Sequence, residues 1–234
     1  PEFSQHVMEQ IVKAPLKGKS YRYSCLNFML LKEMVEKIAG MPMDSYLDSV
    51  FYTPMGLRHI AFRPLRKFAK QEIVPSVKED YLRGGPLQGF VQDEAAAFMG
   101  GVSGNAGLFA TAHDVAKIAQ MWLDKGICGD RRYLSRATCE LFMSLKSRSS
   151  RRGLGFDKPD VDHPENSPCA PETPASVFGH TGYTGTCVWV DPEHDLIFVF
   201  LSNRTYPSAF GPNNLVRYNI RTRIQQAMYQ SLMR

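Results

Sequence analysis

The chain has 234 residues, of which 44% are hydrophobic and 22% are charged, as in ordinary globular proteins. This length suffices for one large domain or two small ones with a buried core, so a disordered, collagen-like or coiled-coil chain is excluded. Lys and Arg number 28 against 23 Asp and Glu, which gives a net charge of +5. Because no basic stripe concentrates this excess, we expect no nucleic-acid partner.

Membrane, disulfide and metal signals are weak along the chain. No apolar run approaches the roughly 18 residues that a membrane helix needs, so we expect no membrane insertion. Residues 1–20 lack the charged start and apolar core of a signal peptide. The five cysteines have no CxxC spacing, and the six histidines have no ligand spacing. We therefore expect no metal site and mostly free thiols, with one disulfide pair left open.

The first half of the chain has a helical pattern interrupted by extended segments. Residues 26–39 carry apolar side chains at helical spacing and end at Gly40, which predicts a helix. A second short helix is predicted over 43–51. The prolines and glycines of residues 56–92 favour an extended or loop structure, and the alanines of 93–99 favour another helix. The face of the first helix that we expect to be buried consists of Leu30, Leu31, Met34, Val35 and Ile38.

Two more helices and a long loop follow. A capping box at Thr111 predicts a helix to about Leu123, and Ser135 caps another helix that extends to about Leu145. Residues 148–176 hold five prolines and form a long irregular stretch, which is usually functional or linking. The basic run that precedes and enters this stretch is interpreted as a solvated face. It consists of Lys146, Arg148, Arg151 and Arg152.

The end of the chain has a different character. Residues 177–190 and 196–202 are rich in strand formers, and residues 191–195 between them predict a hairpin turn. Residues 214–233 predict an amphipathic closing helix. The order of helices, hairpin and helix indicates an α+β fold. The face that we expect the closing helix to bury consists of Val216, Ile220, Ile224, Ala227 and Met228.

Two short motifs carry groups capable of chemistry. The HTG segment, residues 179–185, places His180 and Thr181 among glycines, which in a strand imply close approach by a ligand or by another chain segment. Taken alone, this pattern favours a strand bend with a satisfied histidine. The tyrosine turn, residues 23–25, lies directly before the first helix, where Tyr and Ser most often serve as packing and capping groups.

Together with a third motif, these segments resemble a known superfamily. The Tyr-Ser-x-x-x-Phe sequence at Tyr23, the Gly-Asn-Ala-Gly-Leu-Phe-Ala-Thr-Ala-x-Asp stretch at 104–114 and the His-Thr-Gly-x-Thr-Gly sequence at His180 occur in order. Over residues 18–233 the chain resembles serine β-lactamases and penicillin-binding proteins, in their class C-like, His-Thr-Gly branch. It is similar above all to the β-lactamase-type domain that follows a family 3 glycoside hydrolase in some bacteria.

The resemblance implies roles for individual residues. Tyr23 and His180 match the catalytic tyrosine and the first residue of the family's Lys-Thr-Gly or His-Thr-Gly strand. Thr181, Gly182 and Tyr183 would bind substrate, with the Tyr183 N–H as an oxyanion donor worth roughly 3 kcal/mol. The reaction implied is acyl transfer to a serine, hydrolysing an amide, ester or β-lactam, with a peptidoglycan-derived peptide as one substrate class. No cofactor is implied.

Two departures from the family pattern change this expectation. No serine has Lys three positions later, so the family's Ser-x-x-Lys nucleophile and base are absent. In addition, Cys25 occupies the substrate-binding position where the family has Asn or Asp. A thiolate at Cys25 beside His180 is one alternative, but the pattern favours an inert, half-buried thiol. We therefore expect an incomplete β-lactamase/transpeptidase-like fold that lacks its N-terminal part and is inactive alone.

The same reasoning divides the chain and suggests partners. Residues 1–20 form a lead-in, 21–150 a mainly helical region, and 151–234 the loop, strands and closing helix of one domain. Missing first strands would leave a bare sheet edge, which another copy of the chain or an irregular segment would cover. An upstream glycoside hydrolase domain and a periplasmic or cell-envelope location follow from the resemblance alone. The alternative is a non-catalytic pseudoenzyme or binding module accompanying a glycoside hydrolase.

Overall fold

The computed structural model describes residues 2–15, 18, 21–144 and 147–232. It divides into two compact units, the first made of residues 1–111 with 206–208 and the second of 112–205 with 209–234. From the sequence we expect one domain with three regions, with boundaries at residues 20 and 150. Those regions differ from the two compact units and stay a prediction. None of the described helices has the length and apolar character required to cross a bilayer.

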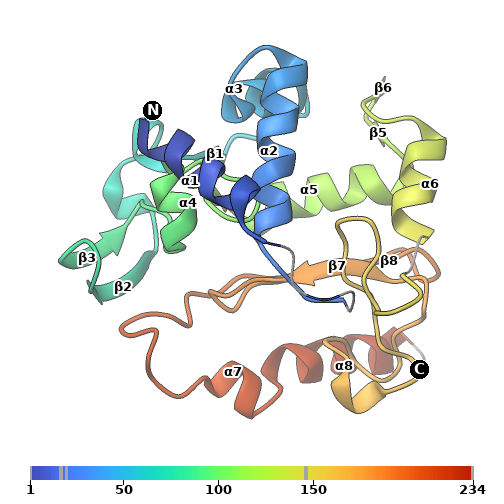
Figure 1. The fold of residues 1–234 in the computed structure, drawn as a ribbon. Coiled ribbons are helices and arrows are strands. Elements are labelled where there is room, and N and C mark those ends of the chain that lie inside the picture. The colour runs from blue at the N-terminus through green and yellow to red at the C-terminus, as the bar shows by residue number, and fades with distance from the viewer. Residues whose placement is uncertain (1, 16–17, 19–20, 145–146, 233–234) are drawn as a thin grey trace. The chain divides into compact units, whose positions relative to one another are not determined.

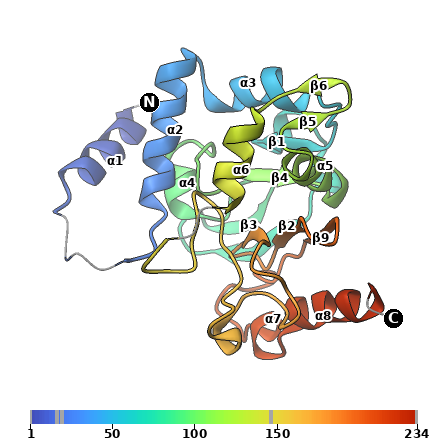
Figure 2. The ribbon, with the colours of Figure 1, turned by 90° about the vertical axis from the view of Figure 1, so that its right-hand side faces the viewer.

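Three expected helical segments of the first unit are confirmed, and a further helix over Glu2–Lys13 was not among the expected ones (Figure 1). The periodic segment over 26–39 is a helix that ends at Gly40, whose positive φ of 67° suits a residue without Cβ. The second predicted helix is confirmed, although its last turn is π-helical. These elements are α1 (Glu2–Lys13), α2 (Leu26–Ala39), α3 (Met43–Leu47), the π-helical turn Asp48–Tyr52 and α4 (Glu94–Phe98). Figure 2 shows α3 following the C-terminal end of α2.

The buried face of α2 differs from the expected one. Met29 and Lys32 are buried, whereas four of the five apolar residues expected inside are exposed, with Ile38 83% exposed. The Lys32 Nζ lies 2.7 Å from Glu36 and 3.0 Å from Glu33, so its charge is paired. On the same side Gly104 approaches the Phe28 carbonyl so closely that a Cβ would overlap it. Spacing defines an apolar face, but the packing partner decides which face is covered.

Short antiparallel pairs complete the first unit. Strand β1 (Ile60–Phe62) pairs with β4 (Leu108–Ala110), and β2 (Pro75–Asp80) pairs with β3 (Gly85–Gln88). The expected extended or loop character of residues 56–92 is confirmed, with two 3-10 turns in addition.

The second unit has three layers (Figure 1). Helix α5 (Ala112–Leu123) lies on one face of a three-stranded antiparallel sheet and α8 (Ile220–Leu232) lies on the other. One buried cluster, which includes Ala119 and Phe178, fills the α5 side, and a second cluster, which includes Trp189 and Phe198, fills the other side. The remaining elements are β5 (Ile127–Cys128), β6 (Arg131–Arg132), α6 (Arg136–Ser144), β7 (Phe178–Thr181), β8 (Cys187–Asp191), β9 (Leu196–Phe200) and α7 (Asn214–Arg217). This helix and sheet arrangement confirms the expected α+β class.

The single strand expected over 177–190 is wrong. The chain turns back after Thr181, so that β7 and β8 form a hairpin of their own before the expected one between β8 and β9. The turn is closed by Gly182 N–H donating to the Thr186 carbonyl at 2.8 Å and by Gly185 N–H donating to the Gly182 carbonyl at 3.0 Å. The residues of the turn have strand-forming neighbours on both sides, so the sequence pattern did not mark the turn. The glycines within the turn allow the chain to reverse there.

The closing helix is also different from the one expected. It breaks between α7 and α8 at Asn219, whose φ is +50°. Gln225 and Tyr229 are buried, whereas Ile224 is 39% exposed. The reason is hydrogen bonding: the Gln225 side-chain oxygen accepts from the Ala170 N–H at 2.9 Å. Polar side chains with buried partners therefore face inward, and part of the apolar face remains outside.

The two edges of the three-stranded sheet differ. At the β7 edge, the irregular segment before the sheet forms a bridge in which Asp157 and Gly179 exchange both backbone hydrogen bonds, at 2.7 and 3.0 Å. At the other edge, β9 pairs only with β8 among the described strands. An irregular segment therefore covers part of the β7 edge, and β9 is an edge strand of this unit.

Candidate functional site

The tyrosine turn lies in the first unit, directly before α2. Tyr23 is 51% exposed, and its hydroxyl lies 3.9 Å from the Cys25 Sγ. The Ser24 hydroxyl accepts from the Leu26 N–H at 3.2 Å, and the Cys25 carbonyl accepts from the Phe28 N–H at 3.1 Å. Backbone and hydroxyl contacts thus fix the turn, and they leave the phenol of Tyr23 at the surface.

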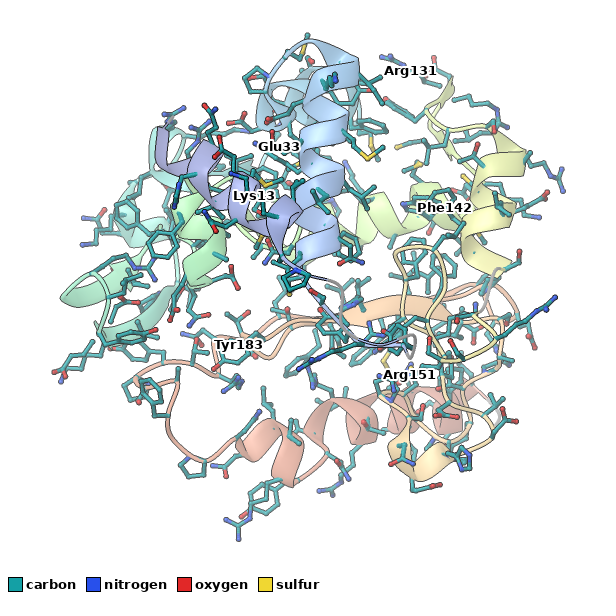
Figure 3. The ribbon with its side chains drawn as sticks, viewed as in Figure 1. Lys13, Glu33, Arg131, Phe142, Arg151 and Tyr183 are labelled. Atoms are coloured by element: carbon teal, nitrogen blue, oxygen red, sulfur yellow. The ribbon has the colours of Figure 1, made fainter. Side chains whose placement is uncertain are left out.

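The HTG segment lies in the second unit at the end of β7. His180 and Thr181 are its last two residues and are partly buried, while Gly182 and Tyr183 enter the turn. Tyr183 is 62% exposed (Figure 3). The Arg204 guanidinium lies 4.3 Å from the centre of its ring, and the Arg204 Nε donates to the Tyr183 carbonyl at 2.7 Å. Arg204 therefore fixes the position of the residue whose N–H is the predicted oxyanion donor.

The glycines of the HTG segment admit other parts of the chain. A Cβ on Gly179 would overlap the Val188 carbonyl, a Cβ on Gly182 would overlap the Thr186 hydroxyl, and a Cβ on Gly185 would overlap the Ser202 hydroxyl. Of the two explanations that the sequence left open, close approach by another chain segment thus accounts for all three glycines.

The imidazole of His180 is held by two partners on opposite ring atoms. Its Nδ1 lies 2.7 Å from the Thr181 carbonyl, and its Nε2 lies 2.6 Å from the Arg152 guanidinium. Burial lowers the pKa of His180 below its ordinary value of 6.5, and the nearby cation of Arg152 lowers it further. His180 is therefore predominantly neutral at neutral pH.

A fully buried carboxylate supports this arrangement. Asp157 accepts from Arg151 at 2.8 and 3.1 Å and lies 3.3 Å from Arg152. Both arginines were interpreted as part of a solvated basic face, and this is wrong, because they pair with a carboxylate that has no exposed surface. The sequence offered one unused signal, the Arg-Arg-Gly-Leu-Gly-Phe-Asp run that brings two cations and an anion within seven residues.

The sequence-predicted site residues fall into two groups. Tyr23 and Cys25 lie together in the first unit, whereas His180 to Tyr183 lie together in the second. That the two groups form the walls of one pocket stays a prediction, as do the catalytic and binding roles assigned to each residue. All five cysteines are free thiols. The three buried ones are Cys139, Cys169 and Cys187.

Comparison with known proteins gives a consistent picture. The sequence model of the family described as Beta-lactamase matches residues 2–219. Proteins of Escherichia coli O157:H7 and Salmonella typhi, each named "Putative D-alanyl-D-alanine carboxypeptidase", are 33% identical to this chain over 223 residues. The alignments cover 88% of this chain but 50% and 51% of those proteins. The chain thus spans about half the length of the curated relatives it matches.

Solved structures show the same fold at low sequence identity. A β-lactamase from Mycobacterium bovis is 21% identical with a TM-score of 0.58, over 90% of this chain and 65% of that one. The octameric penicillin-binding protein homologue from Pyrococcus abyssi is 17% identical with a TM-score of 0.62, over 93% of this chain and 46% of that one. From the family match over residues 2–219, together with this shared fold, we conclude that the chain belongs to the β-lactamase family of serine hydrolases related to penicillin-binding proteins.

Proposed function

We propose that this chain forms the part of a β-lactamase-like serine hydrolase that carries the tyrosine turn and the HTG segment. The reaction is acyl transfer to a serine, which hydrolyses an amide, an ester or a β-lactam. The observation that carries this proposal is the family match over residues 2–219. The sequences at Tyr23 and at His180, which resemble the family's tyrosine and His-Thr-Gly motifs, lie within that range and support it. A peptidoglycan-derived peptide is the substrate class that the names of the curated relatives suggest.

We further propose that the 234 residues by themselves do not turn over substrate. Acyl transfer needs an activated nucleophile, and the family's Ser-x-x-Lys pair does not occur in the sequence. Arginine replaces the lysine at Ser149 and Ser231, and a guanidinium stays protonated, so it cannot act as base. The class C-like branch and an upstream glycoside hydrolase domain belong to the same proposal.

The decisive experiment measures turnover of nitrocefin and of a p-nitrophenyl ester by the purified chain. We expect rates at the level of buffer alone. Turnover well above that level, abolished by Tyr23→Phe or His180→Gln but retained in the surface control Tyr218→Phe, would show that the chain contains its own nucleophile. Reading the coding sequence upstream separates the two remaining cases. An in-frame Ser-x-x-Lys indicates part of an enzyme, and its absence indicates a pseudoenzyme.

A further inference from the structure

His180 stands between two groups whose chemistry fixes the positions of its protons. The Thr181 carbonyl can only accept a hydrogen bond, so the Nδ1 atom at 2.7 Å from it carries the proton. The Arg152 guanidinium can only donate, so the Nε2 atom at 2.6 Å from it presents its lone pair. The ring is therefore the Nδ1–H tautomer, with Nε2 as an acceptor.

Arg152 is itself held by a carboxylate tied to the same strand. The buried Asp157 lies 3.3 Å from the Arg152 Nη2, and its backbone pairs with Gly179, the residue before His180. The contacts thus form a closed network. The Gly179 backbone pairs with Asp157, the Asp157 carboxylate pairs with Arg152, and Arg152 donates to the imidazole of His180, the residue after Gly179. An arginine so constrained loses little further freedom when it donates to His180.

We propose that Arg152 is a positioning residue for the HTG segment, which, held by Asp157, fixes His180 as the Nδ1–H tautomer with Nε2 engaged. The permanent cation next to the imidazole is then Arg152, and the histidine itself stays neutral. For catalysis the consequence rests on the proposed function: with its Nε2 lone pair engaged, His180 is a poor proton acceptor.

The charged and titratable groups around His180 are few in the described structure. The segment before the sheet contributes two cations, Arg151 and Arg152, and one anion, Asp157, to the surroundings of the imidazole. Strand β8 contributes Cys187, opposite Thr181, and burial raises the pKa of that thiol to about 11, so it is uncharged at neutral pH. Arg151 therefore provides a matched control, because it is a second cation near the ring that donates its hydrogen bonds to Asp157.

The test is a nuclear magnetic resonance measurement on the 234-residue chain labelled with ¹⁵N-histidine, with the His180 signals assigned by His180→Gln. We expect the wild-type ring to show the pattern of the Nδ1–H tautomer and to titrate below 6.5. Arg152→Met should bring the midpoint toward about 6.5 and mix in the Nε2–H tautomer. Arg151→Met should leave the tautomer unchanged, and Arg152→Lys, which retains a charged donor, should preserve it.

A dominant Nε2–H tautomer in the wild-type chain would overturn the proposal, as would equal tautomer changes, or none, in Arg151→Met and Arg152→Met. The wild-type tautomer can overturn the proposal by itself. If Arg152→Met fails to fold, a less disruptive Arg152→Gln variant measures the part of the effect that belongs to Arg152. Since the readout needs no turnover, it also stands apart from the proposed function. Ester hydrolysis by the chain would refute inactivity and leave the tautomer assignment intact.

Discussion

Tyr229 of α8 donates its hydroxyl to the carboxylate of Asp191 at the end of β8, with 2.7 Å between the oxygens. Both residues are buried, and Asp191 also accepts from the Glu193 N–H and lies 2.8 Å from the His194 Nδ1 in the following turn. Burial and this carboxylate raise the pKa of Tyr229, which therefore remains a donor at any physiological pH. One carboxylate thus joins the β8–β9 turn to the closing helix.

From this contact we expect Tyr229→Phe to lower the free energy of unfolding by about 1–3 kcal/mol, because a buried carboxylate loses a donor. Urea unfolding followed by circular dichroism measures the change. The control is Tyr218→Phe, whose ring is exposed before α8 and which we expect to change stability by less than about 0.5 kcal/mol. Equal effects of the two substitutions would show that the hydrogen bond does not stabilise the unit.

The pH dependence of stability should carry a signature of His180. Because its pKa is lowered in the folded chain, the unfolded chain binds more protons just below pH 6.5. The neutral histidine therefore contributes its full stability above pH 6.5, and this stability is lost as the pH falls through 6.5 toward the lowered value. Unfolding free energies between pH 5 and 7.5 should show this slope in the wild type and a smaller one in His180→Gln. A slope unchanged by the substitution would contradict the assignment.

Gly179 should be the glycine of the HTG segment that tolerates substitution least. A Cβ there would overlap the Val188 carbonyl and lie 2.8 Å from the Trp189 ring, so strands β7 and β8 would have to separate. We expect Gly179→Ala to destabilise the second unit by more than about 3 kcal/mol. Gly155→Ala is the control, since its Cβ meets open space and only the positive φ of 76° costs about 1–2 kcal/mol. Thermal unfolding of both variants decides the ranking.

In the first unit, Arg83 joins the β2–β3 turn to the segment that leads into α4. Its guanidinium donates to Asp80 at 2.8 Å and to the Val91 carbonyl at 2.6 Å. The hydrogen bond from Arg83 lowers the pKa of Asp80, so the stability from this pair is present above pH 3.8 and lost as the pH falls through the lowered value. Arg83→Gln should cost about 2–3 kcal/mol at neutral pH.

The matched control for Arg83 is Arg66→Gln, because the Arg66 side chain is exposed. Urea unfolding at neutral pH should separate the two variants clearly. The loss of stability below pH 3.8 that comes from Asp80 should become smaller in Arg83→Gln alone, because the folded and unfolded pKa values of Asp80 then lie closer together. A loss of stability in Arg66→Gln as large as in Arg83→Gln would instead indicate a general effect of removing positive charge from this unit.

The edge of β9 leads to an expectation about self-association. Its five residues contain no charge and no proline, and Leu196 lines an open apolar groove together with residues of α8. Such an edge recruits another strand, and we expect a second copy of this chain to provide it. Light scattering after size exclusion should show concentration-dependent dimers, reduced by Ile224→Lys in the groove but unchanged by Val216→Lys on α7. A monomer at every concentration would refute this.

The local sequence determined the ends of those helices that carry clear capping or stop signals, because such signals act over a few residues. Gly40 ends α2, and the Ser135 hydroxyl accepts from the Thr138 N–H at the start of α6. The three motifs likewise sufficed to indicate the family, since each is contiguous in the chain. The hydrophobic periodicity also identified an apolar face on α2 and on α8. It could not predict which face of each helix would be buried in the fold.

Only the tertiary structure decided which residues became partners across long separations. Lys32 and Gln225 are buried because charged or backbone partners meet them there, and Arg152 lies against His180, 28 residues along the chain, because Asp157 pairs with Gly179. A run of arginines looks solvated when taken alone. The pairing of Arg151 and Arg152 depends on the carboxylate of Asp157, which becomes fully buried only when the strand and the loop come together, since burial and pairing arise from three-dimensional packing.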